Sequence, residues 1–365
     1  MIPGAQYHPL FYNVILILTL ISFLKMYSKL TDCNVSEVKV FNDSFALIFA
    51  ILLIFFMGLR PINTSYFGDT VNYAHSFRLM ERGQLTSDAI SKDWLFYTLM
   101  LKCSQIMGIG TFFLIVETLY IGLALMAIYR LCPNNVWLMF ITYVGAFSFF
   151  SYGVNGIRNG MAASIFLLAL SFAHKKMIII GLIILAGSFH SSLWLPTIAL
   201  IFAYFYNNSK LYMIFWVLAI PLSFFFGGFF AGFFAGLGFD ERLSKFISDS
   251  TIKEQFSNTG FRWDFLLYSS IPVAVGYYVI FVRKVTSGFY SLLLNTYIIS
   301  NGIWILIIKS GFSNRFAYLS WFLYPVVLLY PFLNFNMWKK QYNIVAIVVI
   351  MHFAFTYTMR LLGKI

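Results

Sequence analysis

The sequence predicts an all-α integral membrane protein, with about twelve transmembrane helices and one interfacial or re-entrant helix. First, 60% of its 365 residues are hydrophobic and only 10% are charged, whereas a soluble domain carries roughly 25% charged residues. Second, the apolar residues form long blocks, near the ~20 residues that a helix needs to cross the hydrocarbon core. Third, these blocks lack the polar alternation of membrane barrel strands, which excludes a barrel.

The expected spans follow one another without a linker or a change in composition, so we expect a single membrane domain over residues 1–365. They lie near 10–24, 44–59, 111–129, 135–152, 159–173, 177–189, 191–206, 211–237, 264–282, 289–308, 316–333 and 343–361. The first block has no basic start, which favours a span over a signal peptide. Outer-face loops are expected near 60–110 and 238–263.

Basic residues in alternate short loops predict the orientation. Lysine and arginine collect in cytoplasmic loops, and they occur here at 175–176, 210, 283–284 and 339–340. This places Arg158, His190 and Arg315 on the extracytoplasmic side. The apolar segment 94–107 is too short to span and contains Lys102. If it crossed, every later loop would change sides, so we expect it to lie along the outer face or to re-enter there.

The net charge and the scattered cysteines and histidines limit the ligands that the protein is expected to bind. The formal net charge of +12 fits either the positive-inside rule or binding of anionic head groups and phosphates. The three cysteines and five histidines are scattered, so we expect no disulfide framework, metal site or cofactor. No nucleic-acid partner is expected.

The first candidate motif follows the second expected span. Arg60 ends that span before Pro61, and Asp69 precedes Tyr73 by four residues, so these two share a face if the segment is helical. Asp69 is either a helix cap or, beside several arginines, a general base or a group that orients an arginine.

The second motif is the glycine-rich connection 153–162, which contains Arg158. Arg158 lies near a helix start, where the backbone N–H groups and the helix dipole also favour an anion. An arginine fork there fits a phosphate. The alternative is an arginine that extends to lipid head groups.

Two further motifs complete the set. His190 interrupts a long apolar stretch at an expected outer-face hairpin, as either an interhelical hydrogen-bonding group or a catalytic residue. Arg315 begins a span rich in aromatic residues, including Tyr318, which belong to an interfacial belt or stack on sugar rings. Glu117 lies inside an apolar span, where an acidic residue is either a functional candidate or the partner of a polar group on another helix.

In this order, the motifs resemble the EpsG-type family of bacterial exopolysaccharide polymerases, which are similar in role to Wzy polymerases. The matching pieces are Arg60 with Asp69…Tyr73, the turn 158–162, the hairpin 189–191 and the helix start at Arg315…Tyr318. The helical blocks between them also fit, so the resemblance covers nearly the whole chain. The family often has Gln after the arginine of the second motif, where this chain has Asn159.

The resemblance implies a metal-independent membrane glycosyltransferase that polymerises lipid-linked oligosaccharide repeats into O-antigen, capsule or exopolysaccharide. The donor would be carried on undecaprenyl pyrophosphate, and the enzyme would act at the outer face of the bacterial inner membrane. A chain-length regulator or a flippase would be a further partner. The implied substrate-binding residues are Arg158, Arg315, Arg60, Tyr73, Asn159 and Tyr318, and His190 and Asp69 are the candidates for the base.

The sequence leaves two other classes of membrane protein open. An O-antigen ligase or a sugar O-acyltransferase would share arginines and a histidine at the outer face and would differ in its acceptor. A flippase or transporter for lipid-linked glycans usually has internal repeats and several deep charges, and the sequence has no repeat.

Overall fold

The computed structural model describes residues 2–27, 40–86, 92–236, 260–310 and 313–363, and in these ranges it contains helices and no strands. Most of the loop expected near 238–263 lies outside the described residues. Contacts divide the chain into two compact units, which are described separately. Unit 1 comprises Met1–Ser191 and Phe332–Ile365, and unit 2 comprises Ser192–Pro331.

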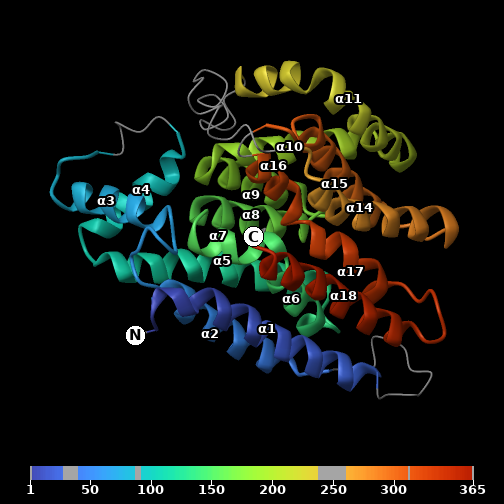
Figure 1. Ribbon diagram of the computed structural model, residues 1–365, viewed down its shortest axis with the longest axis horizontal. Coiled ribbons are helices and arrows are strands. Elements are labelled where there is room, and N and C mark those ends of the chain that lie inside the picture. Colours follow the sequence, from blue (N-terminus) through green and yellow to red (C-terminus); the bar gives the residue numbers. More distant parts are fainter. Residues whose placement is uncertain (1, 28–39, 87–91, 237–259, 311–312, 364–365) are drawn as a thin grey trace. The chain divides into compact units, whose positions relative to one another are not determined.

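Unit 1 is built around α5, which packs against α2 and α8, while α8 packs against α9 and α1 packs against α18 (Figure 1). Asn42 begins α2 as a cap, because its side chain accepts a hydrogen bond from the Phe45 N–H at 3.0 Å. The helices of this unit are α1 (Gly4–Tyr27), α2 (Asp43–Gly58), α3 (Thr70–Glu81), α4 (Trp94–Ser104), α5 (Ile109–Leu131), α6 (Val136–Val144), α7 (Phe147–Val154), α8 (Ile157–Leu170), α9 (Lys176–Phe189) and α18 (Gln341–Leu361).

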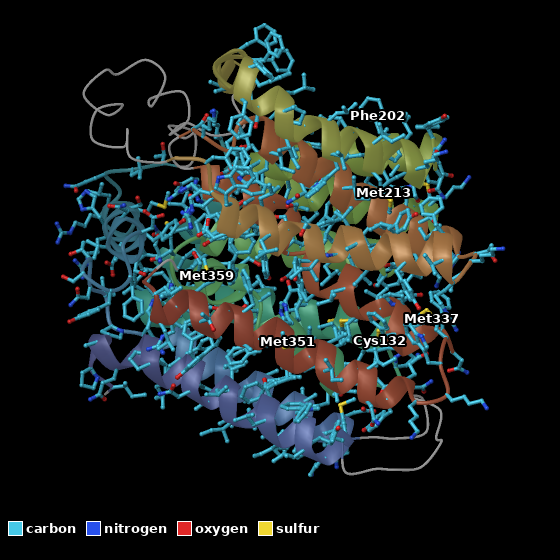
Figure 2. The ribbon with its side chains drawn as sticks, turned by 45° about the vertical axis from the view of Figure 1, so that its right-hand side comes forward. Cys132, Phe202, Met213, Met337, Met351 and Met359 are labelled. Atoms are coloured by element: carbon cyan, nitrogen blue, oxygen red, sulfur yellow. The ribbon has the colours of Figure 1, made fainter. Side chains whose placement is uncertain are left out.

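The two ends of unit 1 differ in their charged residues. Since α8 and α9 form a hairpin, Arg158 and His190 lie at one end and Lys175 lies at the other. Asn334 Nδ2 donates to Cys132 Sγ (3.5 Å), which places the residues before α18 at the Lys175 end. Figure 2 shows Met337 and Cys132 near each other and Met359 far along α18 from them. The alternating basic loops of the sequence predicted this separation of Arg158 and His190 from Lys175 and Lys339.

The helices that lie wholly or mostly in unit 2 are η3 (Ser191–Leu193), α10 (Trp194–Phe205), α11 (Ser209–Gly236), α14 (Trp263–Tyr277), the π-helix η4 (Tyr278–Val282), α15 (Gly288–Leu306), α16 (Ser313–Trp321) and α17 (Tyr324–Asn334). A buried amide on α15 joins that helix to three others. Asn301 on α15 accepts from Trp216 Nε1 at 2.8 Å and donates to Ser269 at 3.1 Å and Ser320 at 2.9 Å. These bonds satisfy its polar atoms inside an apolar interior.

Seven helices of the described residues are long and apolar enough to cross a membrane, or eight if the bent pair α6–α7 forms one span. The expected count of about twelve is therefore not confirmed. The remaining expected spans correspond to shorter apolar helices of 10–17 residues, namely Asp43–Gly58, Ile157–Ser171, Lys176–Phe189 and Ser191–Phe205. A helix of this length is shorter than the ~30 Å hydrocarbon core.

The segment expected to be interfacial forms α4, a helix of 11 residues. At 1.5 Å per residue it is about 16 Å long, roughly half of the hydrocarbon thickness. It packs against α3, α5 and α9 through its buried face, which includes Phe96 and Met100. Its length therefore agrees with a helix that does not cross, and its depth in the membrane remains a prediction.

Candidate functional site

The turn between α7 and α8 positions Arg158 in the first turn of α8. A Cβ atom at Gly160 would lie 2.9 Å from the Tyr152 carbonyl oxygen, so glycine alone permits this close approach of α8 to α7. At Gly153 a Cβ would meet the end of the flexible Met57 side chain on α2, so this position is less restrictive. Gly160 thus allows α8, with Arg158 in its first turn, to pack closely against α7.

Asp93, which directly precedes α4, joins three parts of unit 1. Its Oδ2 accepts hydrogen bonds from Arg158 Nη1 and His190 Nδ1, both at 2.7 Å, and its Oδ1 accepts from the Ser191 N–H at 2.8 Å. The backbone is left-handed, with φ of 56°, a conformation that aspartate tolerates better than most residues. The side chain is only 3% exposed, so the carboxylate is shielded from water.

Two tyrosines hold the guanidinium of Arg158 from the sides. Its Nε donates to the hydroxyl of Tyr73 on α3 at 3.4 Å, and its Nη1 also donates to the hydroxyl of Tyr97 on α4 at 3.2 Å. The guanidinium carbon lies 5.7 Å and 5.4 Å from the centres of the same two rings. These distances are within the range of cation–π attraction, so α3 and α4 together orient Arg158.

His190 ends α9, and its extended backbone (φ −153°, ψ 120°) turns the chain towards η3. At this point the ring reaches Asp93, and the next backbone N–H reaches the other carboxylate oxygen. The α9 terminus is therefore attached to the α4 terminus through one carboxylate.

The charge of Asp93 determines the tautomer of His190. Burial alone would raise the pKa of Asp93, but the hydrogen bond and charge of His190, the charge of Arg158 and the Ser191 N–H together lower this pKa to about 2. Asp93 is thus an acceptor at neutral pH, and we assign the proton of the bond to Nδ1 of His190. In the tautomer that carries the proton on Nδ1, Nε2 is the ring nitrogen that can accept a proton.

Two atoms of this cluster remain open. Arg158 Nη2 and His190 Nε2 have no hydrogen-bond partner among the described residues, and neither is among the buried unsatisfied atoms. The side chain of Arg158 is 27% exposed and that of His190 is 16% exposed. The cluster therefore offers a guanidinium N–H and an open imidazole nitrogen on adjacent side chains.

Arg60 forms a separate pair with Glu117 on α5. Its Nη1 donates to Glu117 Oε1 at 3.1 Å and to the Met57 carbonyl at 2.6 Å, and its Nε donates to Thr70 Oγ1 at 3.4 Å. The two charged side chains are 0% and 1% exposed. Of the two alternatives for Glu117, pairing with a polar group on another helix agrees with this geometry, whereas Arg60 has no exposed surface for a substrate.

The other predicted residues lie as follows. Asp69 precedes the first residue of α3 and is half-buried, and Asp93 rather than Asp69 bonds to both Arg158 and His190. Asn159 is half-buried beside Arg158 in α8. Arg315 and Tyr318 belong to α16 in unit 2, where both are half-buried.

The sequence interpretation did not include Asp93, Tyr97 or Ser191. A signal for two of them was present, because Asp93 and Tyr97 have the same four-residue spacing as Asp69 and Tyr73. The Ser191 contact involves only its backbone N–H, which no side-chain pattern reports.

The apolar helices and the buried charge pairs define a multi-pass membrane protein with a polar cluster at one end of its first unit. The EpsG family profile matches residues 44–363, which is nearly the whole chain. The chain therefore belongs to the EpsG family, and the predicted resemblance is confirmed. Comparison with curated proteins and with solved structures gives no match. Membership in the family suggests an exopolysaccharide polymerase.

Proposed function

We propose that this protein polymerises a surface polysaccharide by transferring a growing glycan from a lipid-linked pyrophosphate to a sugar hydroxyl of another lipid-linked repeat. One observation carries the proposal within the EpsG family. His190 is oriented by Asp93 so that Nε2 stays open, and it lies beside an arginine that keeps one open nitrogen. A proton acceptor beside an anion-binding group is what transfer from a pyrophosphate requires.

In the proposed step, the acceptor oxygen forms a bond to the anomeric carbon of the donor, and the bond from that carbon to the pyrophosphate oxygen breaks. The hydroxyl proton moves to His190 Nε2. The bonding electron pair leaves with the lipid pyrophosphate, and Arg158 Nη2 donates to the leaving oxygen. No oxidant, reductant or further reactant is needed.

The charge of the cluster changes in the direction that this step requires. Before transfer, Arg158 and Asp93 neutralise each other and His190 is neutral. After His190 accepts the proton, the cluster carries one net positive charge next to a leaving group that has become more negative. Preorganised charge of this kind commonly contributes about a hundredfold or more to a rate.

Other residues have supporting roles in this proposal. Tyr73, which the sequence predicted, and Tyr97, which it did not, orient Arg158. Asn159 is a candidate for binding a sugar hydroxyl. Arg315 and Tyr318 are candidates for a second phosphate and a sugar ring. The donor is an undecaprenyl-pyrophosphate oligosaccharide, and the site faces outward from the bacterial inner membrane.

Deletion of the gene, followed by gel analysis of the surface glycan, tests the proposed activity. Loss of long chains with retention of single repeats is expected. Accumulation of complete lipid-linked polymer that is not transferred onward would instead identify a ligase. Complementation with His190→Ala and Asp69→Asn, at matched membrane abundance, compares the two candidate bases, and we expect the deeper loss for His190→Ala. Near-normal chain length in both variants and in Arg158→Ala would disprove the site.

A further inference from the structure

An apolar groove follows the first half of α11 in unit 2. It has a volume of about 600 Å³ and is lined by Lys210, Met213, Ile214, Val217, Leu218, Tyr277 and Phe281. The α11 residues repeat every three to four positions, so they form one face of the helix. Several are well exposed, including Val217 (57%) and Leu218 (51%). In a multi-pass membrane protein such a face contacts acyl chains, and here that face is hollowed.

The groove ends in a polar pocket at the start of α11. This pocket of about 450 Å³ is lined by Phe205, Tyr206, Asn207, Asn208, Ser209, Lys210, Ile280, Phe281 and Ser291. Lys210 and Phe281 line both cavities, so the cavities adjoin. One cationic side chain, two amides and three hydroxyl groups (Tyr206, Ser209 and Ser291) therefore lie beside an apolar groove.

The amides of the pocket are already oriented as donors. Asn207 Oδ1 accepts from the buried Asn295 Nδ2 at 2.6 Å, so the NH₂ group of Asn207 is left to donate. Asn208 Oδ1 accepts from the Leu211 N–H at 3.1 Å, and its Nδ2 donates to the Tyr206 hydroxyl at 3.3 Å, which leaves one amide hydrogen for a ligand. No acidic residue lines either cavity, and Arg283 and Lys284 follow Val282, two and three positions after Phe281. This end thus favours an anion.

A local irregularity of the backbone shapes the wall of the groove. After α14 the chain forms the π-helix η4, in which the Arg283 N–H donates to the Tyr278 carbonyl at 2.8 Å. Lys284 then has a left-handed backbone with φ of 54°. π-helical turns widen a helix and are frequent at functional sites. The two η4 residues Ile280 and Phe281 face the cavities.

We propose that these adjoining cavities bind one anionic phospholipid, with its phosphate at Lys210, Asn207 and Asn208 and an acyl chain along α11. The positive charge without an acidic neighbour selects an anionic head group over a zwitterionic one. The apolar groove selects an amphiphile over a free phosphate. The proposal is independent of the polymerase reaction, because none of the residues proposed for that reaction lines the cavity.

Native mass spectrometry of the purified full-length protein tests the proposal. We expect one phosphatidylglycerol to remain bound at detergent concentrations that remove phosphatidylcholine. Lys210→Gln should weaken this retention about fivefold, as expected for one lysine near an anionic lipid. Lys210→Arg should keep it, and Lys176→Gln, which changes an exposed lysine in unit 1, should leave it unchanged.

Three results would overturn the assignment. The first is equal retention of the two phospholipids. The second is an equal effect of Lys210→Gln and Lys176→Gln. The third is displacement of phosphatidylglycerol by a lower concentration of undecaprenyl phosphate, which would identify the polyprenyl carrier as the occupant.

Discussion

Two arginine–carboxylate pairs lie at the same end of unit 1, and they differ in their surroundings. Arg60 and Glu117 are completely buried and join α2 to α5, whereas Arg158 with Asp93 is partly open and is joined by a histidine. A buried pair cannot exchange its partner for a substrate without leaving a charge in an apolar interior. The comparison indicates that burial, rather than residue type, separates the pair that holds helices together from the pair that can bind and react.

The largest expected effect is a loss of protein stability when the buried pair of Arg60 and Glu117 is broken. Arg60→Met leaves Glu117 buried without its cation, and we expect the free energy of unfolding to fall by about 3–5 kcal/mol. The double variant Arg60→Met with Glu117→Leu should recover most of this loss, because both charges are removed. Thermal unfolding in detergent and membrane abundance measure the effect. A stable Arg60→Met protein that makes no polymer would instead place Arg60 in substrate binding.

Substitutions in the open pair, Arg158 with Asp93, should lower the activity and leave the membrane abundance unchanged. We expect Arg158→Ala to lower the polymerisation rate about a hundredfold, the typical cost of removing one preorganised donor. Arg158→Lys should lose nearly as much, because a lysine keeps the charge but cannot reach Asp93, Tyr73 and Tyr97 together. Arg130→Ala, at the opposite end of unit 1, is the control. Normal chain length in Arg158→Lys would show that charge alone suffices.

Asp93→Asn tests the orientation of His190. The amide cannot accept from every donor around it, so we expect the rate to fall at least about tenfold while the variant still inserts. His190→Ala in the same assay gives the limit for complete loss of the base. An Asp93→Asn protein with the normal rate would show that His190 needs no orienting carboxylate.

The stabilisation that Asp93 contributes should depend on pH, and the same variant tests this. The pKa of Asp93 is lowered to about 2 in the folded protein, whereas an unfolded aspartate has a pKa near ~3.9. Its stabilisation is therefore complete above about pH 5 and is lost as the pH falls towards 2. The difference in melting temperature between wild type and Asp93→Asn should shrink as the pH falls from about 5 towards 2. A difference that grows over this range contradicts the assignment.

The smallest effects belong to the tyrosines beside Arg158. Tyr73→Phe and Tyr97→Phe each remove one hydrogen bond, so we expect losses of about two- to tenfold in rate. Together they should approach the effect of Arg158→Lys. Tyr27→Phe, an exposed position on α1, should leave the rate unchanged.

Much of the fold could be predicted because long apolar segments without polar alternation form helices in lipid, where the backbone groups have no other partner. The sequence also predicted that Arg158 and His190 lie at the same end of their helices, because the basic loops alternate along the chain. The exact number of spans could not be predicted in this way. Helices such as α8 and α9 have 14 residues, and hydropathy alone does not separate a short span from a buried helix.

The site was harder to predict than the fold. Arg158 and His190 were proposed because each lies in a short polar connection between apolar blocks, and Tyr73 because it follows Asp69 by four residues. Asp93 was missed because its partners are distant in the chain, and its role depends on the packing of α4 against α9. Arg60 shows the opposite error, because a boundary arginine does not reveal in sequence that Glu117 neutralises it.

The division of unit 1 into two chain segments has a consequence for biosynthesis. Its last helix, α18, packs on α1, and Tyr357 bonds to Asn13 at 2.8 Å, yet all of unit 2 is synthesised between them. At ~5–20 residues per second, α1 waits some tens of seconds in the membrane before its partner emerges. During that interval lipid or a membrane chaperone must cover its buried face, and ribosome pausing within unit 2 would lengthen the exposure.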